Sequence, residues 1–319
     1  MHRFGPLSLA VLLVGFAACQ KGGKVQHPPL VVAIDLWPGY YPVLLAKDLG
    51  YFEQANLAVD IRIPENTDRM LGEFDAGIND IIAVALGDLV PLTREGSHFK
   101  VILVSDESTG DAVVSLKPLP EQPSDFEGLR IATNLSGFGE LFLLEMLRHY
   151  GVEMGRITLV NSEASQIPAG LEAQFFDAGH TWQPYVSLVL DAGGVQWFSS
   201  RQAPGLILDV VAVNDRVLKS RPDDIRKFTA AWLKALDWWQ SNPEAGWQKI
   251  DAILGERAGP HFSDACILQD LNANRERFEG EGPGSLTHSV QKFSSFFLDR
   301  GTLSKPVDPA LILDGRFLP

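Results

Sequence analysis

The chain has 319 residues, of which 45% are hydrophobic and 21% are charged. A sequence of this length and apolar content can bury a substantial core, and it is large enough to divide into two lobes. Its formal net charge of −13 would repel the phosphates of DNA and RNA, so the composition argues against a nucleic-acid partner.

The N-terminus is predicted to be an export signal. His2 and Arg3 precede the apolar run from Leu7 to Ala18, which is shorter than the roughly 20 apolar residues that span a bilayer. We therefore assign residues 1–18 to a signal peptide.

The residues after the signal resemble a bacterial lipobox. Two alanines precede Cys19, which would be lipidated after cleavage and would anchor the protein to the membrane. Phe16 departs from the usual aliphatic residue, so plain cleavage near Ala18 is the alternative. Residues 19–29 are polar and contain glycine and proline, as expected of a tether.

The first stretch of the mature chain reads as strand, loop and helix. Leu30 to Ile34 is a short apolar run typical of a buried strand, and Pro42 to Leu49 is expected to be helical. The loop between them carries Trp37 and Tyr40. Ligands of open α/β sheets bind at the carboxyl ends of strands, so these two rings are candidate ligand contacts.

Short apolar runs then alternate with helical segments. The expected strands are Leu30–Ile34, Ala58–Ile63, Ile81–Val84, Val101–Val104, Val113–Leu116, Leu129–Thr133, Ile157–Val160 and Leu206–Val213; the expected helices include Pro42–Leu49, Asp68–Phe74, Gly139–Tyr150 and Ala164–Phe175. This βαβ pattern predicts mainly parallel sheets of the α/β class.

Breaks at 117–124 and 199–205 divide this pattern into two lobes with a ligand cleft between two open sheets. We assign 30–116 and 206–319 to the first lobe and 117–205 to the second.

The last third is predicted to be helical. A helix from Pro222 and another from Leu286 carry apolar residues at steps of three and four, which indicates packing against a core. Cys266 is expected in a helix that starts near Ser263, as a buried and inert thiol.

The sequence contains none of the common catalytic motifs that we searched for. It has no Gly-x-Ser-x-Gly, phosphate-binding Gly-x-x-x-x-Gly-Lys-Ser/Thr or His-Glu-x-x-His motif, and its seven histidines are scattered. We therefore expect no enzyme activity, no metal and no cofactor.

Gly137 and Gly139 precede a predicted helix, and Ser136 could cap it. The free backbone N–H groups of such a helix start attract an acceptor or an anion. An ordinary cap far from any ligand is the alternative.

Polar clusters also follow several predicted strands, as expected of facing loops at one site. The complete set of candidate ligand-binding residues is Trp37, Tyr40, Gly87, Asp88, Asp106, Ser108, Asp111, Ser136, Gly137, Gly139, Thr181, Trp182 and Asp209.

Four segments carry a family resemblance. They are WPGYYPVLLAKDLGYFEQANLAVDI from residue 37, SDESTGDAVV from 105, FEGLRIATNLSGFGELFLLEML from 126 and FFDAGHTWQPY from 175. Together they resemble substrate-binding proteins of ABC transporters for nitrate, sulfonate, taurine and thiamine precursors, the NMT1-like group, whose fold also occurs in yeast-type pyrimidine synthases. The resemblance implies the two-lobe fold of type 2 periplasmic binding proteins.

This resemblance also implies a function. A monomeric exported protein would capture a small molecule by hinge closure and deliver it to ABC permease subunits. Trp37 and Tyr40 would stack on the ligand, the Ser136 to Gly139 segment would donate hydrogen bonds, and Thr181 would assist. A sensory binding protein for a membrane kinase, or a pyrimidine-synthase-like enzyme, are the alternatives; the synthases depend on a cysteine- and histidine-rich patch that this sequence lacks.

The candidate loops indicate the charge of the ligand. They contain no Lys or Arg but several acids, including Asp88, Asp106 and Asp111. A bare sulfonate or nitrate would be desolvated against unpaired carboxylates, which favours a heteroaromatic, amine or zwitterionic ligand. We expect Trp37 to be the main apolar contact and Asp111 the main acceptor. An anionic group held by the helix start, or acids that point to solvent, are the alternatives.

Overall fold

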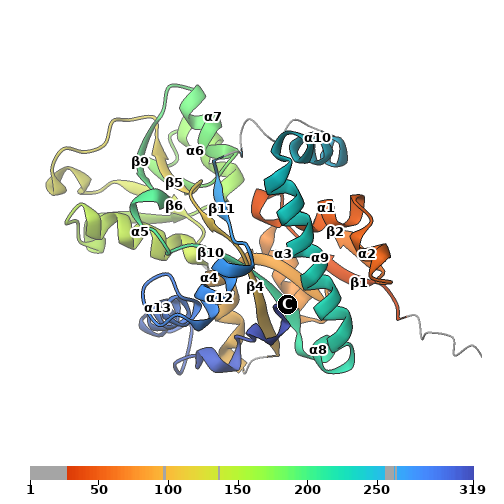
Figure 1. The fold of residues 1–319 in the computed structure, drawn as a ribbon. Helices are drawn as coiled ribbons and strands as arrows, with labels where there is room; N and C mark the ends of the chain where they lie inside the picture. Colours follow the sequence, from red (N-terminus) through yellow and green to blue (C-terminus); the bar gives the residue numbers. More distant parts are fainter. Residues whose placement is uncertain (1–26, 96–97, 136, 256–261, 263) are drawn as a thin grey trace, which may run out of the picture.

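The computed structural model describes residues 27–95, 98–135, 137–255, 262 and 264–319. These residues form two lobes, each built on its own sheet and covered by helices (Figure 1). The predicted two-sheet α/β architecture is therefore confirmed. Within the described part of the chain, no helix is both long enough and apolar enough to cross a bilayer. The predicted signal peptide, Cys19 and Ser136 lie outside the described residues.

Lobe one contains a sheet with the strand order β11-β4-β10-β3-β1-β2. Its strands are β1 (Leu30–Ala33), β2 (Val59–Arg62), β3 (Ile81–Ala85), β4 (Phe99–Ser108), β10 (Leu208–Asn214) and β11 (Cys266–Leu268). β1 pairs in parallel with β2 and β3, but β10 is antiparallel to both β3 and β4. The sheet is mixed rather than mainly parallel because β10 enters it from the other lobe, against the direction of its neighbours.

Lobe two contains a sheet with the strand order β7-β6-β8-β5-β9. Its strands are β5 (Ala112–Ser115), β6 (Arg130–Thr133), β7 (Thr158–Asn161), β8 (Ala178–Thr181) and β9 (Val195–Ser199). β6 is parallel to β7 and β8, whereas β5 is antiparallel to β8 and β9.

The outward crossover between the lobes comes earlier than the sequence indicates. β5 pairs in the second sheet, so the chain changes lobe between Ser108 and Ala112, and the boundary expected after residue 116 is wrong. The prolines of 117–124 instead form a loop inside lobe two. The return crossover lies between β9 and β10, at 200–207, close to the expected break at 199–205.

The helices of each lobe follow its strands. The α-helices of lobe one before the crossover are α1 (Pro42–Asp48), α2 (Tyr51–Gln54), α3 (Thr67–Asp75) and α4 (Leu86–Leu89); those of lobe two are α5 (Phe138–His149), α6 (Ile167–Glu172) and α7 (Tyr185–Asp191); those of the C-terminal third are α8 (Asp215–Ser220), α9 (Pro222–Ser241), α10 (Pro243–Leu254), α12 (Leu271–Glu279) and α13 (Leu286–Asp299). Short 3₁₀ helices are η1 (Pro38–Tyr40), η2 (Val90–Glu95), η3 (Pro123–Phe126), η4 (Met154–Arg156), η5 (Ala164–Gln166), η6 (Ser200–Gln202), η7 (Pro309–Leu311) and η8 (Gly315–Phe317).

The helix expected from Pro222 is confirmed as a core helix. α9 begins with Pro222 at its first turn, where a proline needs no N–H partner, and Asp223 and Asp224 follow at the positive end of the helix dipole. Its apolar stripe, including the fully buried Trp232, packs into the core of lobe one.

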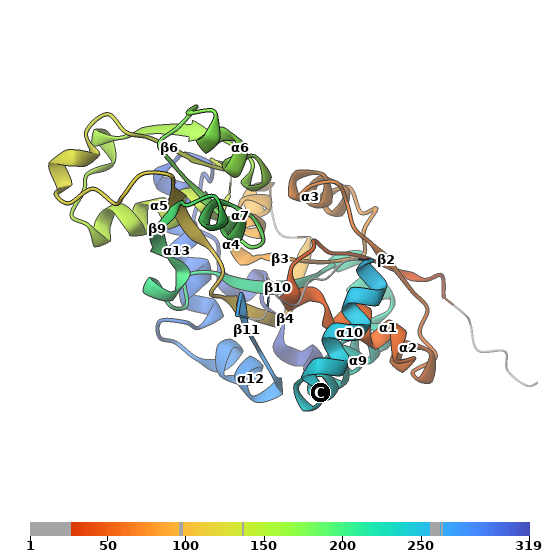
Figure 2. The same ribbon diagram turned by 90° about the horizontal axis from the view of Figure 1, so that it is seen from above.

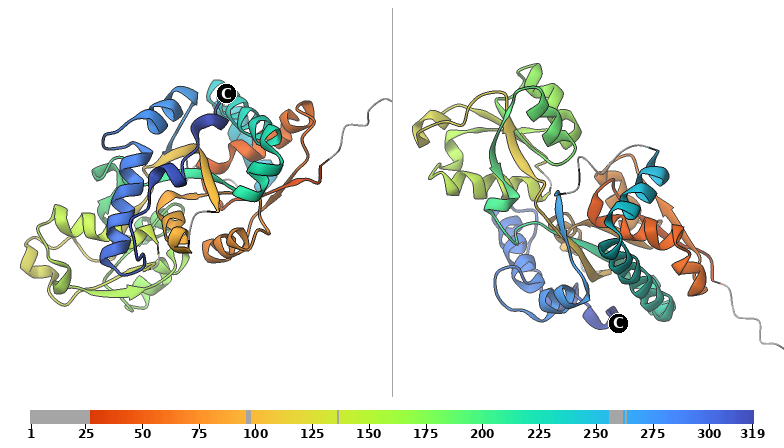
Figure 3. Two further views of the ribbon diagram at one scale, coloured as in Figure 1. Left: turned by 90° about the horizontal axis from the view of Figure 1, so that it is seen from below. Right: turned by 45° about the horizontal axis from the view of Figure 1, so that its top comes forward.

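α13 packs on both lobes, although the sequence assigns it to lobe one. Leu286 and Val290 belong to the lobe one core, while Phe293 and Phe297 share a second cluster with Phe142 of lobe two. Figure 3 shows this long blue helix alongside the second lobe. The C-terminal helix therefore ties the two lobes together on the side where the chain crosses between them.

Cys266 does not lie in a helix. It begins β11, which pairs with β4 from Ser108 to Asp106. The helix expectation was wrong because a three-residue strand contains too few residues to show a period of two. Cys266 is only partly buried, although the sequence predicts a buried thiol. Desolvation raises the pKa of this thiol well above its ordinary value, which disfavours the reactive thiolate.

Candidate ligand-binding cleft

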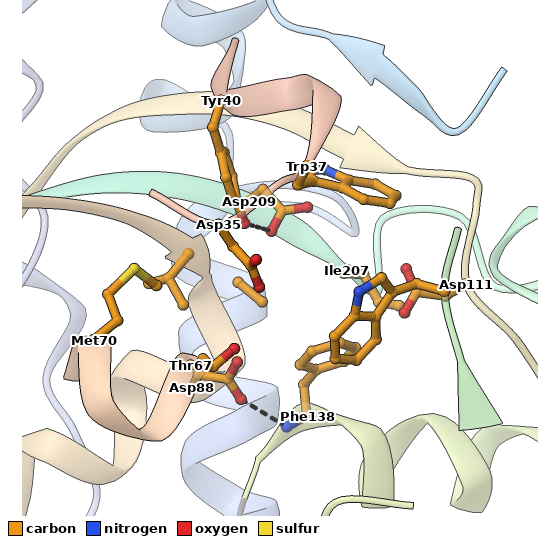
Figure 4. Close-up of a pocket in the computed structure, with 13 residues that line it drawn as sticks. Asp35, Trp37, Tyr40, Thr67, Met70, Asp88, Asp111, Phe138, Ile207 and Asp209 are labelled. Carbon is orange, nitrogen blue, oxygen red and sulfur yellow. Dashed lines mark hydrogen bonds between the residues drawn. The ribbon is translucent and has the colours of Figure 1, made fainter. Parts of the chain in front are cut away.

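A cavity with ≈ 430 Å³ of empty space lies between the two lobes (Figure 4). The first sheet contributes loops after β1 and β3 and the start of β10, and lobe two contributes the start of α5 and the loop after β8. The lining residues are Asp35, Trp37, Tyr40, Thr67, Met70, Val84, Ala85, Asp88, Asp111, Phe138, Trp182, Ile207 and Asp209.

The loop after β1 is held in place by two buried carboxyl groups. The Trp37 indole N–H donates to Asp106 at 3.0 Å, and the Tyr40 hydroxyl donates to Asp209 at 2.6 Å. Gly39 lies between the two rings, and a Cβ atom there would stand only 1.6 Å from a carboxyl oxygen of Asp106. The loop can approach β4 so closely because this position has no side chain.

Asp106 and Asp209 face each other across β4 and β10, where they are register partners. Both are buried, at 0% and 4% exposure. Burial raises the pKa of Asp106 to about 6, and burial, followed by the nearby Asp106 charge, raises the pKa of Asp209 well above its ordinary value. Two adjacent buried carboxyls resist carrying two negative charges, so we assign one shared proton to the pair.

The Tyr40 hydroxyl stays protonated in this environment. Burial, then the charges of Asp209 and Asp106, raises the pKa of the Tyr40 phenol well above its ordinary value. The ring therefore offers the cavity an uncharged aromatic face, with its hydroxyl engaged by Asp209.

Lobe two contributes aromatic rings and one carboxylate. Phe138 and Trp182 lie with their ring centroids 6.1 Å apart, and both line the cavity. Figure 4 shows Phe138 across the space from Trp37. Asp111, on the outward crossover, accepts hydrogen bonds from Ser108 and from the ring of His180, the latter at 3.1 Å. Asp111 is only 3% exposed, so its partners fix the carboxylate at the edge of the site.

A second space of ≈ 460 Å³ adjoins this cavity, and the residues that line both are Thr67, Asp88, Phe138 and Trp182. The second space is also lined by Asp68 of α3, Glu163 before η5, and Gly137 and Gly139 at the start of α5. Figure 2 shows α3 of lobe one facing α6 of lobe two. Burial, with a further contribution from Asp68, raises the pKa of Glu163.

Acidic side chains line both spaces, and no Lys or Arg does so among the described residues. Two further acids of the candidate loops pair with arginines instead: Glu107 pairs with Arg277, and Glu140 pairs with Arg300. In the described part of the chain, no Lys or Arg pairs with the other acids that line the cleft, and Asp111 has the ring of His180 at 3.1 Å. Among the described residues, no group of three or more His, Cys, Asp or Glu side chains is arranged to hold a metal ion.

The structure brings six of the predicted residues to the inner cavity: Trp37, Tyr40, Asp88, Asp111, Trp182 and Asp209. Gly137 and Gly139 line the second space of the cleft. Four others support the site from behind. Asp106 holds Trp37, Ser108 holds Asp111, Gly87 packs against Phe138, and Thr181 donates to the Ala164 carbonyl at 2.9 Å. Thr181 therefore has its hydroxyl engaged within lobe two.

Several lining residues were missed by the sequence analysis. Asp35 directly follows β1 and Thr67 begins α3, so each stands at a strand end or a helix start, the kind of position already singled out. Phe138 lies between two glycines that were noted. Met70 and Ile207 gave no signal, because an apolar residue in a helix or strand is indistinguishable from core in the sequence.

Comparisons with known proteins agree with this architecture. The family model described as NMT1/THI5 like matches residues 37–246. The taurine-binding periplasmic protein of Escherichia coli is 25% identical over 56% of this chain and 59% of its own length. A 4-amino-5-hydroxymethyl-2-methylpyrimidine phosphate synthase of Saccharomyces cerevisiae is 25% identical over 66% of each chain.

The fold matches a solved binding protein over a longer span. The periplasmic aliphatic sulphonate binding protein SsuA of Escherichia coli superposes with a TM-score of 0.70 at 15% identity, covering 89% of this chain and 97% of that one. At this identity the superposition shows the shared fold. The family model covers most of the described lobes, and the chain belongs to the NMT1/THI5 like family.

Proposed function

We propose that this chain is the exported solute-binding protein of an ABC importer, and that it captures a nitrogen-bearing ligand that is cationic, zwitterionic or heteroaromatic. The observation that carries the ligand class is the lining of the cleft. Aromatic rings and carboxylates surround the cavity without a facing Lys or Arg among the described residues. A positively charged nitrogen group, or one with several N–H donors, would complement such a lining.

The aromatic rings suit a flat or ammonium-bearing molecule. Trp37, Tyr40, Phe138 and Trp182 converge on the space from both lobes. A cation over an indole or phenol face gains about 0.5–2 kcal/mol, more when water is excluded. Asp35 and Asp111 lie at the same cavity and would accept hydrogen bonds from ligand N–H groups.

The charge of the cleft favours a ligand different from those that two relatives are named for. Taurine and aliphatic sulphonates carry a sulfonate, and the relatives are named for binding them. A sulfonate in the present cleft would be desolvated beside carboxylates with no compensating cation, which costs several kcal/mol. We therefore transfer the importer role from the relatives but not their sulfonate ligands.

The two crossovers supply the closure mechanism. They connect β4 to β5 and β9 to β10, and ligand groups that contact both lobes would stabilise the closed arrangement relative to the open one. The permease would then recognise the closed form. An export signal and a lipid anchor at Cys19 complete the proposal, and the mass of the mature N-terminus would test the anchor.

Two alternatives are distinguishable. A yeast relative named as a synthase motivates an enzyme, which would convert its ligand during incubation, whereas a binding protein would return it unchanged. A sensory protein for a membrane kinase would bind and close in the same way, and the genes beside this one would separate it from an importer.

Ligand-induced closure tests the proposal. On adding a saturating amine that binds the wild type, the radius of gyration from X-ray scattering should fall. The free energy of unfolding should rise by about 2.7 kcal/mol at a ligand concentration 100 times Kd. An unchanged scattering envelope at saturation would contradict a closing binding protein.

A further inference from the structure

The start of α5 meets a carboxylate from the opposite lobe. Within the part of the chain that the structure describes, α5 starts after Gly137 without a side-chain cap, although the first amides of a helix need acceptors and attract negative charge. Asp88 of α4 supplies the acceptor, since the Phe138 N–H donates to its carboxylate at 3.2 Å (Figure 4). The protein therefore places its own anion at the positive end of this 12-residue helix.

Two glycines make this approach possible. A Cβ atom on Gly137 would lie 2.2 Å from a carboxyl oxygen of Asp88, and one on Gly87 would lie 2.6 Å from the Cβ of Phe138. A side chain at Gly87 would clash with Phe138 of the opposite lobe and with Phe293. A side chain at Gly137 would displace the Asp88 carboxylate. The contact thus depends on small residues on each side of the cleft, one from α4 and one preceding α5.

Asp88 also lies at the junction of the two spaces of the cleft, because it lines both. Asp68 of α3, Asp111 of the crossover and Glu163 of lobe two act on it with like charge, and burial raises its pKa to about 7. A further anion at the same helix start would have to displace the Asp88 carboxylate or remain beside it. Both arrangements are unfavourable without a cation.

We propose that Asp88 is a specificity-determining residue, whose carboxylate occupies the anion position at the start of α5 and so directs the cleft away from sulfonates and toward nitrogen-bearing ligands. This inference rests on the proposed binding function. It assigns the discrimination between sulfonates and nitrogen-bearing ligands to one side chain. The composition of the cleft alone would attribute this discrimination to all of its acidic residues.

The test compares the wild type with D88N, in which the amide oxygen can still accept from Phe138 N–H but the negative charge is gone. Ethanesulfonate, an anion without an amine, is the probe, and calorimetry at pH 8 keeps the wild-type carboxylate mainly ionised. D88N should bind ethanesulfonate about tenfold more tightly than the wild type. D68N, which removes an acid of the same cleft that makes no bond to α5, should gain clearly less.

The pH profile separates charge from shape. Wild-type affinity for ethanesulfonate should rise as the pH falls from 8 to 6 and Asp88 takes up a proton. D88N should lose this part of the dependence and keep the part that comes from the Asp106–Asp209 pair. Equal ethanesulfonate affinity in the wild type and a folded D88N, or an equal gain in D68N, would overturn the assignment. Should the wild type bind no amine while D88N still gains ethanesulfonate, the role of Asp88 stands and the proposed ligand class fails.

Discussion

The Trp37→Ala variant should lose both stability and ligand affinity. Trp37 is only 6% exposed and packs into the core of lobe one, so truncation should lower the free energy of unfolding by about 3–5 kcal/mol. The same change removes the indole N–H that Asp106 accepts and one aromatic wall of the cavity. Urea unfolding measures the first effect, and calorimetry with an amine that binds the wild type measures the second.

Two controls divide these effects. Trp37→Phe keeps an aromatic face but not the N–H donor, so it should retain more affinity than Trp37→Ala while still destabilising the buried carboxyl pair. Trp238→Ala removes a half-buried tryptophan on α9 that does not line the cleft, and should leave affinity unchanged. Wild-type affinity in a folded Trp37→Ala would show that the loop after β1 does not hold the ligand.

The Asp209→Asn variant should remove much of the pH dependence of stability. The pKa of Asp209 is raised in the folded protein by burial and by Asp106, and that of Asp106 is raised to about 6. The folded state therefore binds more protons than the unfolded chain from about pH 4 upward, to about pH 6 for Asp106 and to a higher pH for Asp209. Wild-type stability falls as the pH rises through this window, by about 1.4 kcal/mol for each unit of pKa elevation.

An asparagine at 209 can still accept from the Tyr40 hydroxyl but cannot ionise. Asp209→Asn should therefore gain stability relative to the wild type at pH 8 and show no such gain at pH 4. Asp191→Asn, at an exposed position on α7, should follow the wild-type curve. Parallel stability curves for the wild type and Asp209→Asn from pH 4 to pH 8 would contradict a shared proton in the pair.

The sequence predicted the fold where local patterns matched the final structure. The apolar runs located most strands, and the break at Trp37 placed an aromatic loop after β1, where the structure has it. The sequence did not indicate which sheet Ala112–Ser115 would join, because this short apolar strand is suited to burial in either sheet. Only the long-range pairing with β8 and β9 decides it.

The sequence predicted many residues of the candidate site but not the hydrogen bonds that connect them. Trp37 and Asp209 were singled out from positions 172 residues apart in the sequence, yet nothing local indicates that Asp106 would hold one ring and Asp209 the other. The start of α5 was expected to be free for an anion. Its partner, Asp88, lies 50 residues earlier, and only the arrangement of the two lobes brings it there.

Calorimetric titration of the wild-type protein with a ligand panel tests the central claim most directly. The panel pairs ethanesulfonate, taurine and nitrate with aminopyrimidines and aromatic or aliphatic amines at pH 8 and low salt, where electrostatic discrimination is largest. We predict tight binding of at least one amine or aminopyrimidine and at best weak binding of ethanesulfonate and nitrate. Tight binding of ethanesulfonate or nitrate, with no measurable binding of any amine or aminopyrimidine, would contradict the account.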